Sequence, residues 1–146
     1  MKSILLFISF LLAGQWTNAQ SQAADITLAA NDYIDAFYLG DTIKLKRSIS
    51  PTVFKYGYFK KKDSPTYVGE PMSYKDMIEY ATRVNKRGPS PKLSTFPRQV
   101  EILSELDQIA SVKLTAWWGV DFLLLAKIDG KWMITQVLWQ SPPAGK

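Results

Sequence analysis

The chain of 146 residues contains no cysteine and no histidine. Without cysteine it can form no disulfide, no zinc–thiolate site and no thiol nucleophile. Without histidine it lacks the usual general base near neutral pH and the commonest metal ligand. Ser-His-Asp catalysis and histidine-based metal sites are therefore excluded, and we expect neither a metal nor a cofactor.

Long apolar runs are also scarce. The one at the N-terminus, Ile4–Gly14, is too short to span a bilayer, follows the positive Lys2 and precedes the small-residue exit Thr17–Ala19. We interpret residues 1–19 as an export signal and residues 20–146 as a single domain, periplasmic or secreted, with no membrane contact after cleavage. An uncleaved anchor is the alternative.

Positive charge is in excess, with a formal net charge of +5. Basic residues cluster around Lys44–Arg47, Lys60–Lys62 and Arg83–Arg87. No recognised nucleic-acid-binding module accompanies them, so we interpret them as solvated surface and expect no nucleic-acid partner.

The order of predicted elements indicates an α+β domain. Apolar residues from Ile26 to Phe37 recur at helical spacing, so a helix should end near Gly40. Asp41 should cap a second helix, with Ile43 and Leu45 on its buried side. The other predicted elements, in chain order, are strands Thr52–Phe59 and Thr66–Gly69, a helix after the capping box Ser73–Asp76, a loop Asn85–Pro97, and strands Gln99–Leu106 and Ile109–Trp118.

The closing stretch, Gly119–Gln140, should fold into a hairpin at Asp129-Gly130, since this dipeptide favours a type I′ turn. The expected pairs are Ile128 with Lys131, Ala126 with Met133, Leu124 with Thr135, Phe122 with Val137, and Val120 with Trp139. Both faces of this hairpin are largely apolar, so each must be covered.

The first helix segment "NDYIDAFYLGD", the strand "SPTVFKYGYF" and the closing "DFLLLAKIDGKWMITQVLW" together resemble the nuclear transport factor 2-like superfamily. Within it, the chain is most similar to the "putative lumazine-binding" and SnoaL-like groups. The resemblance implies a cone, in which a curved antiparallel sheet wraps a long N-terminal helix and encloses a pocket, with two further helices. It also implies that the outer sheet face makes a homodimer.

This resemblance assigns the two hairpin faces. The expected ligand pocket comprises Tyr33, Phe37, Lys55, Trp118, Phe122, Leu124, Val137 and Trp139, and the expected dimer interface comprises Leu123, Leu125, Trp132, Ile134 and Leu138. Trp117 is also expected at the interface, and Asp121 is expected to pair with a lysine of the partner subunit.

Two residues are weak candidates for catalysis. In the steroid isomerase branch, a tyrosine and an internal acid hold an oxyanion while an aspartate moves a proton. Tyr33 matches the tyrosine, but Lys55 stands at the base position and Leu124 at that of the internal acid. If Lys55 faces the pocket, it is an anion clamp or a nucleophilic amine; if it faces solvent, Phe54, Tyr56 and Tyr58 turn inward instead.

The sequence therefore favours an exported protein that binds a small apolar or aromatic ligand, and leans against an enzyme. An enzyme acting on a small carbonyl compound through Tyr33 and Lys55, and a dimeric scaffold without a ligand, are the alternatives. An ionisable group near Tyr33 would favour the enzyme, an open apolar cavity the binder, and a closed core the scaffold.

Overall fold

The computed structural model describes residues 4–61, 64 and 66–143, with side chains from Gln20 onward, Ser21 excepted. The expected export signal, residues 1–19, lies outside the described side chains. In the part of the chain that could be searched, no helix combines the length and hydropathy needed to cross a membrane. The elements are α1 (Ile4–Leu39), α2 (Thr42–Ser48), β1 (Ile49–Lys60), β2 (Tyr67–Pro71), α3 (Tyr74–Arg87), the 3-10 helix η1 (Leu93–Thr95), β3 (Gln99–Glu105), β4 (Ile109–Ala116), β5 (Gly119–Ile128) and β6 (Lys131–Gln140).

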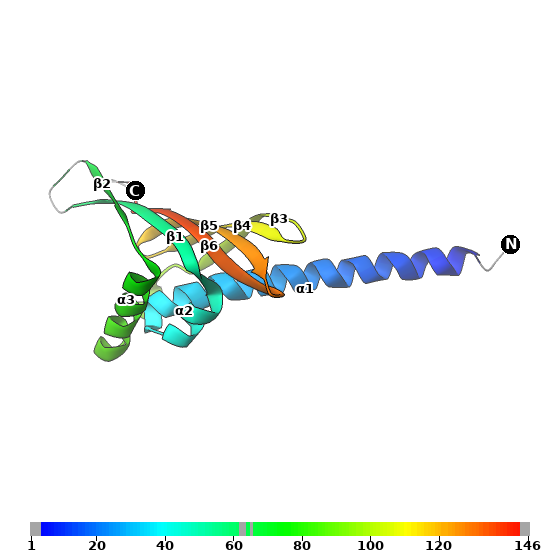
Figure 1. Cartoon of the computed structure of the whole chain (residues 1–146), viewed down its shortest axis with the longest axis horizontal. Helices are drawn as coiled ribbons and strands as arrows, with labels where there is room; N and C mark the ends of the chain where they lie inside the picture. Colours follow the sequence, from blue (N-terminus) through cyan, green and yellow to red (C-terminus); the bar gives the residue numbers. More distant parts are fainter. Residues whose placement is uncertain (1–3, 62–63, 65, 144–146) are drawn as a thin grey trace.

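The strands form one six-stranded sheet in the order β2-β1-β6-β5-β4-β3. All neighbouring pairs are antiparallel except β1 and β6, which are parallel. The sheet curves over the C-terminal half of α1, and α2 and α3 gather at that end of the helix (Figure 1). This arrangement confirms the predicted α+β cone.

The predicted helix caps are confirmed. The Asp41 carboxylate accepts hydrogen bonds from the backbone N–H groups of Ile43 and Lys44 at 3.0 and 2.9 Å. Ser73 and Asp76 form the expected capping box of α3. Leu45 is fully buried, but Ile43 is 76% exposed, so its predicted burial is wrong. Residues two positions apart do not share a helix face, so this short helix could bury only one of them.

The hairpin turns where the sequence predicts. Asp129 and Gly130 both have positive φ, 50° and 77°, as a type I′ turn requires. The pairs Ile128 with Lys131 and Ala126 with Met133 are confirmed.

Beyond Leu125 the register of the hairpin shifts by one residue. The sheet pairs Leu124 with Gln136, Phe122 with Leu138, and Val120 with Gln140. The predicted partners Thr135, Val137 and Trp139 are therefore wrong. An irregularity of this kind places two residues of one strand against one residue of the other. It reverses the facing of the later residues in the strand that carries the extra residue, which here is β6.

The predicted faces of the hairpin are wrong for most of its residues. Leu123, Leu125, Trp132 and Ile134, expected at a dimer interface, are at most 5% exposed and share one core with α1. Phe122 and Leu124, expected in the pocket, lie on the outer face with 49% and 45% of their surface exposed. Only Val137 and Trp139 turn inward as expected, and only Leu138 turns outward. Because both faces are apolar, alternation alone could not tell which one α1 covers.

Candidate functional site

The site lies on the inner face of the sheet, where three neighbouring strands bring two rows of residues together. In the first row, Asp121 of β5, Trp139 of β6 and Gly57 of β1 stand side by side. The adjacent row lies two residues away along each strand and consists of Leu123, Val137 and Lys55. Side chains two residues apart share a face, so this register brings an acid and a lysine to one interior region.

Three polar residues form an inner cluster: Tyr33 of α1, Lys55 of β1 and Asp121 of β5. Lys55 Nζ donates a hydrogen bond of 2.6 Å to Tyr33 Oη. Tyr33 and Asp121 are 0% exposed and Lys55 is 5% exposed. Lys55 therefore faces the interior, which settles the alternative that the sequence left open.

Asp121 is incompletely paired. Its Oδ2 accepts a hydrogen bond of 2.9 Å from Trp118 Nε1, whereas Oδ1 has no hydrogen-bond partner among the described residues. A buried carboxylate oxygen without a donor is costly, so most such atoms in native proteins have a partner. The inner cluster thus has one carboxylate oxygen that no described donor meets at hydrogen-bond geometry, although the Tyr33 hydroxyl is near enough to Asp121 to affect the pKa of both groups.

Burial governs the protonation of all three groups. It lowers the pKa of Lys55 to about 8, against the opposing attraction of Asp121. Burial, reinforced by the negative charge of Asp121, raises the pKa of Tyr33 well above its usual value. Burial also raises the pKa of Asp121, although the charge of Lys55 and hydrogen bonds with Trp118 and Tyr33 oppose this shift. An amine of lowered pKa in an apolar interior is typical of functional sites and also of structural ion pairs.

An aromatic wall separates the inner cluster from the surface. A Cβ placed on Gly57 would lie 1.7 Å from Trp139 Nε1, so the indole lies directly across this glycine. Lys55 and Phe59, the inward neighbours of Gly57 along β1, flank the indole. The Trp139 ring stacks on Phe59 at 6.4 Å with an interplanar angle of 6°, and the Lys55 ammonium lies 6.0 Å from the centre of the same ring.

Outside this wall lies a hollow that we call the aromatic cleft, with a volume of about 450 Å³. Its lining residues are Phe59, Glu70, Trp117, Trp118, Trp139, Ser141 and Pro142. Trp117 and Trp118 stand edge to face at 6.0 Å in the turn between β4 and β5. Trp118 has two roles, because its ring lines the cleft while its Nε1 holds Asp121.

Six of the eight predicted pocket residues turn inward: Tyr33, Phe37, Lys55, Trp118, Val137 and Trp139. Of these, only Trp118 and Trp139 line the cleft, and the other four lie deeper. Leu124, which matched the internal acid of the isomerases, is on the outer face, and the acid inside the sheet is Asp121.

Sequence reasoning missed Asp121, Trp117 and Phe59 as site residues. The signal for Asp121 was present, because it is the lone acid in an apolar strand. The inverted assignment of the hairpin faces concealed it. Trp117, expected at the interface, instead lines the cleft.

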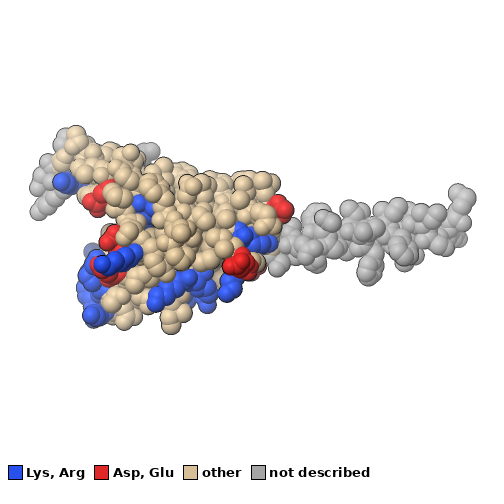
Figure 2. Space-filling view, viewed as in Figure 1, with Lys and Arg blue, Asp and Glu red and all other residues tan. Residues whose placement is uncertain are grey.

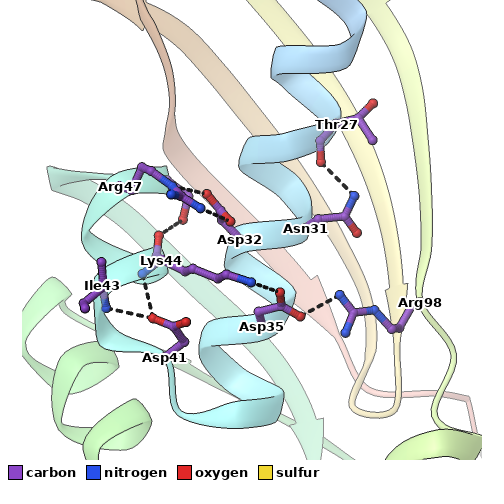
Figure 3. A network of polar contacts seen from close by, with 10 residues as sticks. Thr27, Asn31, Asp32, Asp35, Asp41, Ile43, Lys44, Arg47 and Arg98 are labelled. Atoms are coloured by element: carbon purple, nitrogen blue, oxygen red, sulfur yellow. Dashed lines mark hydrogen bonds and ion pairs between the residues drawn. The ribbon is translucent and has the colours of Figure 1, made fainter.

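A second group of charged residues joins α1 to α2 and to Arg98 (Figure 3). Asp32 accepts two hydrogen bonds from Arg47 at 2.6 and 2.7 Å, and Asp35 binds both Lys44 and Arg98. These helix-linking ion pairs connect α1 to α2 and to the residue preceding β3. Over the described residues, no group of three or more metal-ligating side chains could hold a metal ion.

The remaining basic residues of the helices face solvent. Lysine and arginine gather over α2 and α3, whereas the sheet side in the same view carries little charge (Figure 2). Lys46, Arg83, Lys86 and Arg87 are all exposed, as expected for solvated helix surfaces and ends.

Comparison with known proteins places this architecture in a family. The family model described as "Putative lumazine-binding" matches residues 21–140. The chain belongs to this family. No curated protein matches the sequence.

Solved structures support the same fold. An NTF2-like protein of unknown function from Silicibacter pomeroyi superposes with a TM-score of 0.68 at 16% identity, covering 85% of this chain and 98% of that one. One from Methylobacillus flagellatus gives 0.63 at 20% identity, with 84% and 93% covered. The association domain of C. elegans CaMKII gives 0.53 at 11% identity, with 82% and 95% covered. These similarities show the NTF2-like fold and leave the ligand and any reaction open.

Proposed function

We propose that the protein binds a small, flat, mostly apolar molecule in the aromatic cleft. The observation that carries this proposal is the lining itself, with three tryptophans and Phe59 around about 450 Å³. This volume falls within the range of small-molecule sites, and such sites combine aromatic walls with few polar groups. Membership of the "Putative lumazine-binding" family supports a fused heterocycle as the ligand class.

Titration with lumazine tests this proposal. Lumazine should quench the tryptophan fluorescence of the purified protein and bind with micromolar strength, for which roughly 8 kcal/mol suffices. Trp139→Ala removes a wall of the cleft and should weaken binding by at least about tenfold, since aromatic anchors carry much of the energy of a binding site.

Trp132→Phe is the matched control. Trp132 is a buried tryptophan of the same strand that lies beside the Asp129–Gly130 turn and does not line the cleft. The Trp132→Phe variant should leave the lumazine affinity within about twofold of wild type. Equal losses in the two variants, or no binding of lumazine to the wild type at millimolar concentration, would contradict the proposal.

A specific observation favours the alternative of a carbonyl-processing enzyme. Lys55 lies 2.6 Å from Tyr33, and Asp121 supplies the internal acid that sequence matching did not find. In this conformation these side chains are at most 5% exposed, and a substrate in the cleft would have to displace the Trp139 ring to reach them. The accessible cleft therefore supports binding more directly than catalysis.

Export and dimerisation complete the proposal. The outer sheet face exposes five large apolar side chains: Phe54, Tyr58, Phe122, Leu124 and Leu138. Monomers rarely expose contiguous apolar patches of this kind, which supports a two-fold partner on this face. Leu138→Glu should convert a sedimenting dimer to monomer. A wild-type monomer at micromolar concentration would contradict this assembly and leave the dimeric scaffold without support.

The Lys2 and Ile4–Gly14 pattern supports secretion or export to the periplasm. Terminal sequencing of the exported protein should find a start at or near Gln20. An intact N-terminus would contradict it.

A further inference from the structure

The inner cluster contains one group that ligand binding in the cleft does not use. Lys55 Nζ points into the interior, 4.4 Å from the centre of the Phe37 ring and 5.1 Å from that of Tyr33. A lysine used only to neutralise Asp121 would be expected to bond to it directly. The described contacts instead join Lys55 to the Tyr33 hydroxyl and leave Asp121 Oδ1 without a partner.

The amine lies close behind the cleft. Trp139 lines the cleft, and the centre of the same ring lies 6.0 Å from Nζ. The indole lies directly against β1 at this point, because a Cβ on Gly57 would lie 1.7 Å from Trp139 Nε1. A carbonyl compound in the cleft would reach Nζ by displacing the Trp139 side chain.

We propose that Lys55 is an imine-forming amine, which condenses with a small aromatic aldehyde or ketone that enters through the aromatic cleft. This inference rests on the proposed function of the cleft and names carbonyl compounds as the class that the site can hold covalently. The cleft provides the aromatic surface for the ring of the ligand, and the inner cluster provides the nucleophile for its carbonyl carbon.

The chemistry balances with the groups present. The lone pair of unprotonated Nζ adds to the carbonyl carbon, and the carbonyl oxygen takes up a proton to give a carbinolamine. Loss of that hydroxyl as water, with the remaining nitrogen proton, leaves the C=N bond. Tyr33, 2.6 Å from Nζ and held protonated by its raised pKa, is placed to give a proton to the oxygen and recover one from the nitrogen.

Ionisation of Lys55 supports this reactivity. The titratable side chains that act on Nζ among the described residues are Tyr33 and Asp121. With a pKa of about 8, roughly a quarter of Lys55 is neutral at pH 7.5, against about a thousandth of an ordinary surface lysine. Burial restricts access, but the difference in neutral fraction favours Lys55 by about two orders of magnitude.

Reductive trapping tests the proposal. The purified protein is incubated with benzaldehyde and sodium cyanoborohydride at pH 7.5, where hydride reduces any C=N bond to a stable secondary amine, and labelled peptides are mapped by mass spectrometry. Labelling of Lys55 should exceed that of Lys46, an exposed lysine of α2, by at least about tenfold, and it should increase as the pH rises through 8. Tyr33→Phe should slow labelling of Lys55 without changing that of Lys46.

Two results with the wild-type protein would overturn the inference: labelling of lysines in proportion to their exposure, or no labelling of Lys55. Labelling of Lys55 only in the Trp139→Ala variant would also overturn it, because the ring would then seal the amine off in the native protein. Lys55→Arg keeps a cation at this position and checks the peptide assignment, because an arginine forms no stable imine with benzaldehyde. The lumazine titration is read independently, so loss of trapping with lumazine binding intact would refute this inference alone.

Discussion

Two buried carboxylates, Asp35 of α1 and Asp121 of β5, differ in their partners. Burial alone would raise the pKa of Asp35, but hydrogen bonds from Lys44 and Arg98 outweigh it and the net shift is downward. Burial raises the pKa of Asp121 as well, and there the charge of Lys55 and the Trp118 hydrogen bond do not overcome it. Asp35 has two ionised donors in direct contact and Asp121 has none, and this difference accounts for the opposite directions of their pKa shifts.

This difference separates a carboxylate held by two cations from one whose charge is balanced less directly. Asp35 ties α1 to α2 and to the start of β3 with two short ion pairs at the protein surface, at 2.5 and 2.6 Å. The inner cluster buries an aspartate and a lysine away from water. Lys55 donates a hydrogen bond to the Tyr33 hydroxyl, and Asp121 accepts one from the Trp118 indole. Replacing a buried ion pair by apolar residues of similar volume is often neutral or stabilising, so the burial of this cluster is not in itself evidence that it stabilises the fold.

The largest expected effect comes from Lys55→Met. Removal of the ammonium leaves the Asp121 carboxylate buried without a positive neighbour, which costs about 3 kcal/mol of unfolding free energy at pH 7. The raised folded-state pKa of Asp121 sets the sign of the pH dependence: the variant should recover stability as the pH falls and the carboxyl takes up a proton. Urea denaturation at pH 7 and pH 5 measures both.

The matched control for that loss is the double variant Lys55→Met, Asp121→Asn. It removes both charges and should regain most of the stability that the single variant loses. If single and double variants lose equal free energy, the cost lies in packing, and the electrostatic contrast with Asp35 is mistaken.

Gly57→Ala should have the next largest effect on stability. It sharpens the comparison because it disturbs the aromatic wall and removes no charge. The added methyl group would overlap the Trp139 indole, so the ring must move or the strands must separate. Overpacking of this kind costs about 1 to 3 kcal/mol, and the displaced ring should also weaken lumazine binding. A normal lumazine affinity in Gly57→Ala would show that Trp139 does not form the wall of the binding site.

The sequence predicts the frame of this site better than its orientation. The order of helices and strands, the Asp41 and Ser73 caps and the Asp129-Gly130 turn follow from local chemistry, and all are confirmed. The register of the hairpin does not, because the irregularity between Leu124 and Leu125 has no marker in two runs that are apolar on both faces. The choice of the covered face was wrong as well, which turned Asp121 outward, and because the irregularity lies in β6, only Val137, Leu138 and Trp139 beyond it kept their predicted facing.

The inner cluster could be predicted only in part. Tyr33 and Lys55 were identified by family resemblance, but the direction of Lys55 depends on how β1 pairs with β6, and this pairing also shifts between Ile49 and Phe54. The contact between Trp139 and Gly57 joins residues 82 positions apart through a parallel pairing that local pattern does not encode. The information that the sequence did not supply was the register of strand pairing, and not the residue types.

Asp35→Asn should have a smaller effect, of about 1 kcal/mol. The neutral amide still accepts hydrogen bonds, and Lys44 and Arg98 are about one-third exposed, so water compensates for part of the lost attraction. The lowered folded-state pKa of Asp35 means that its contribution is present above the unfolded value near 3.8 and is lost as the pH falls through the folded one. The variant should therefore lose less stability than wild type between pH 5 and pH 3 in thermal unfolding. An identical acid limb in the two proteins would mean that Asp35 carries no stabilising charge.

The smallest expected effect is that of Lys44→Met, the same substitution as at Lys55 and also beside a buried aspartate. Here the carboxylate keeps Arg98 at 2.6 Å, and the lysine removed is already one-third exposed. An exposed partner of this kind contributes about 0.5 kcal/mol or less after solvent screening. The pair of lysine variants therefore compares a buried lysine beside a singly neutralised aspartate with a partly exposed lysine whose aspartate keeps a second cation. Chemical denaturation of both proteins side by side at pH 7 should give a loss several times larger for Lys55→Met. Equal losses would mean that Asp121 is protonated in the native protein at neutral pH and gains nothing from its lysine.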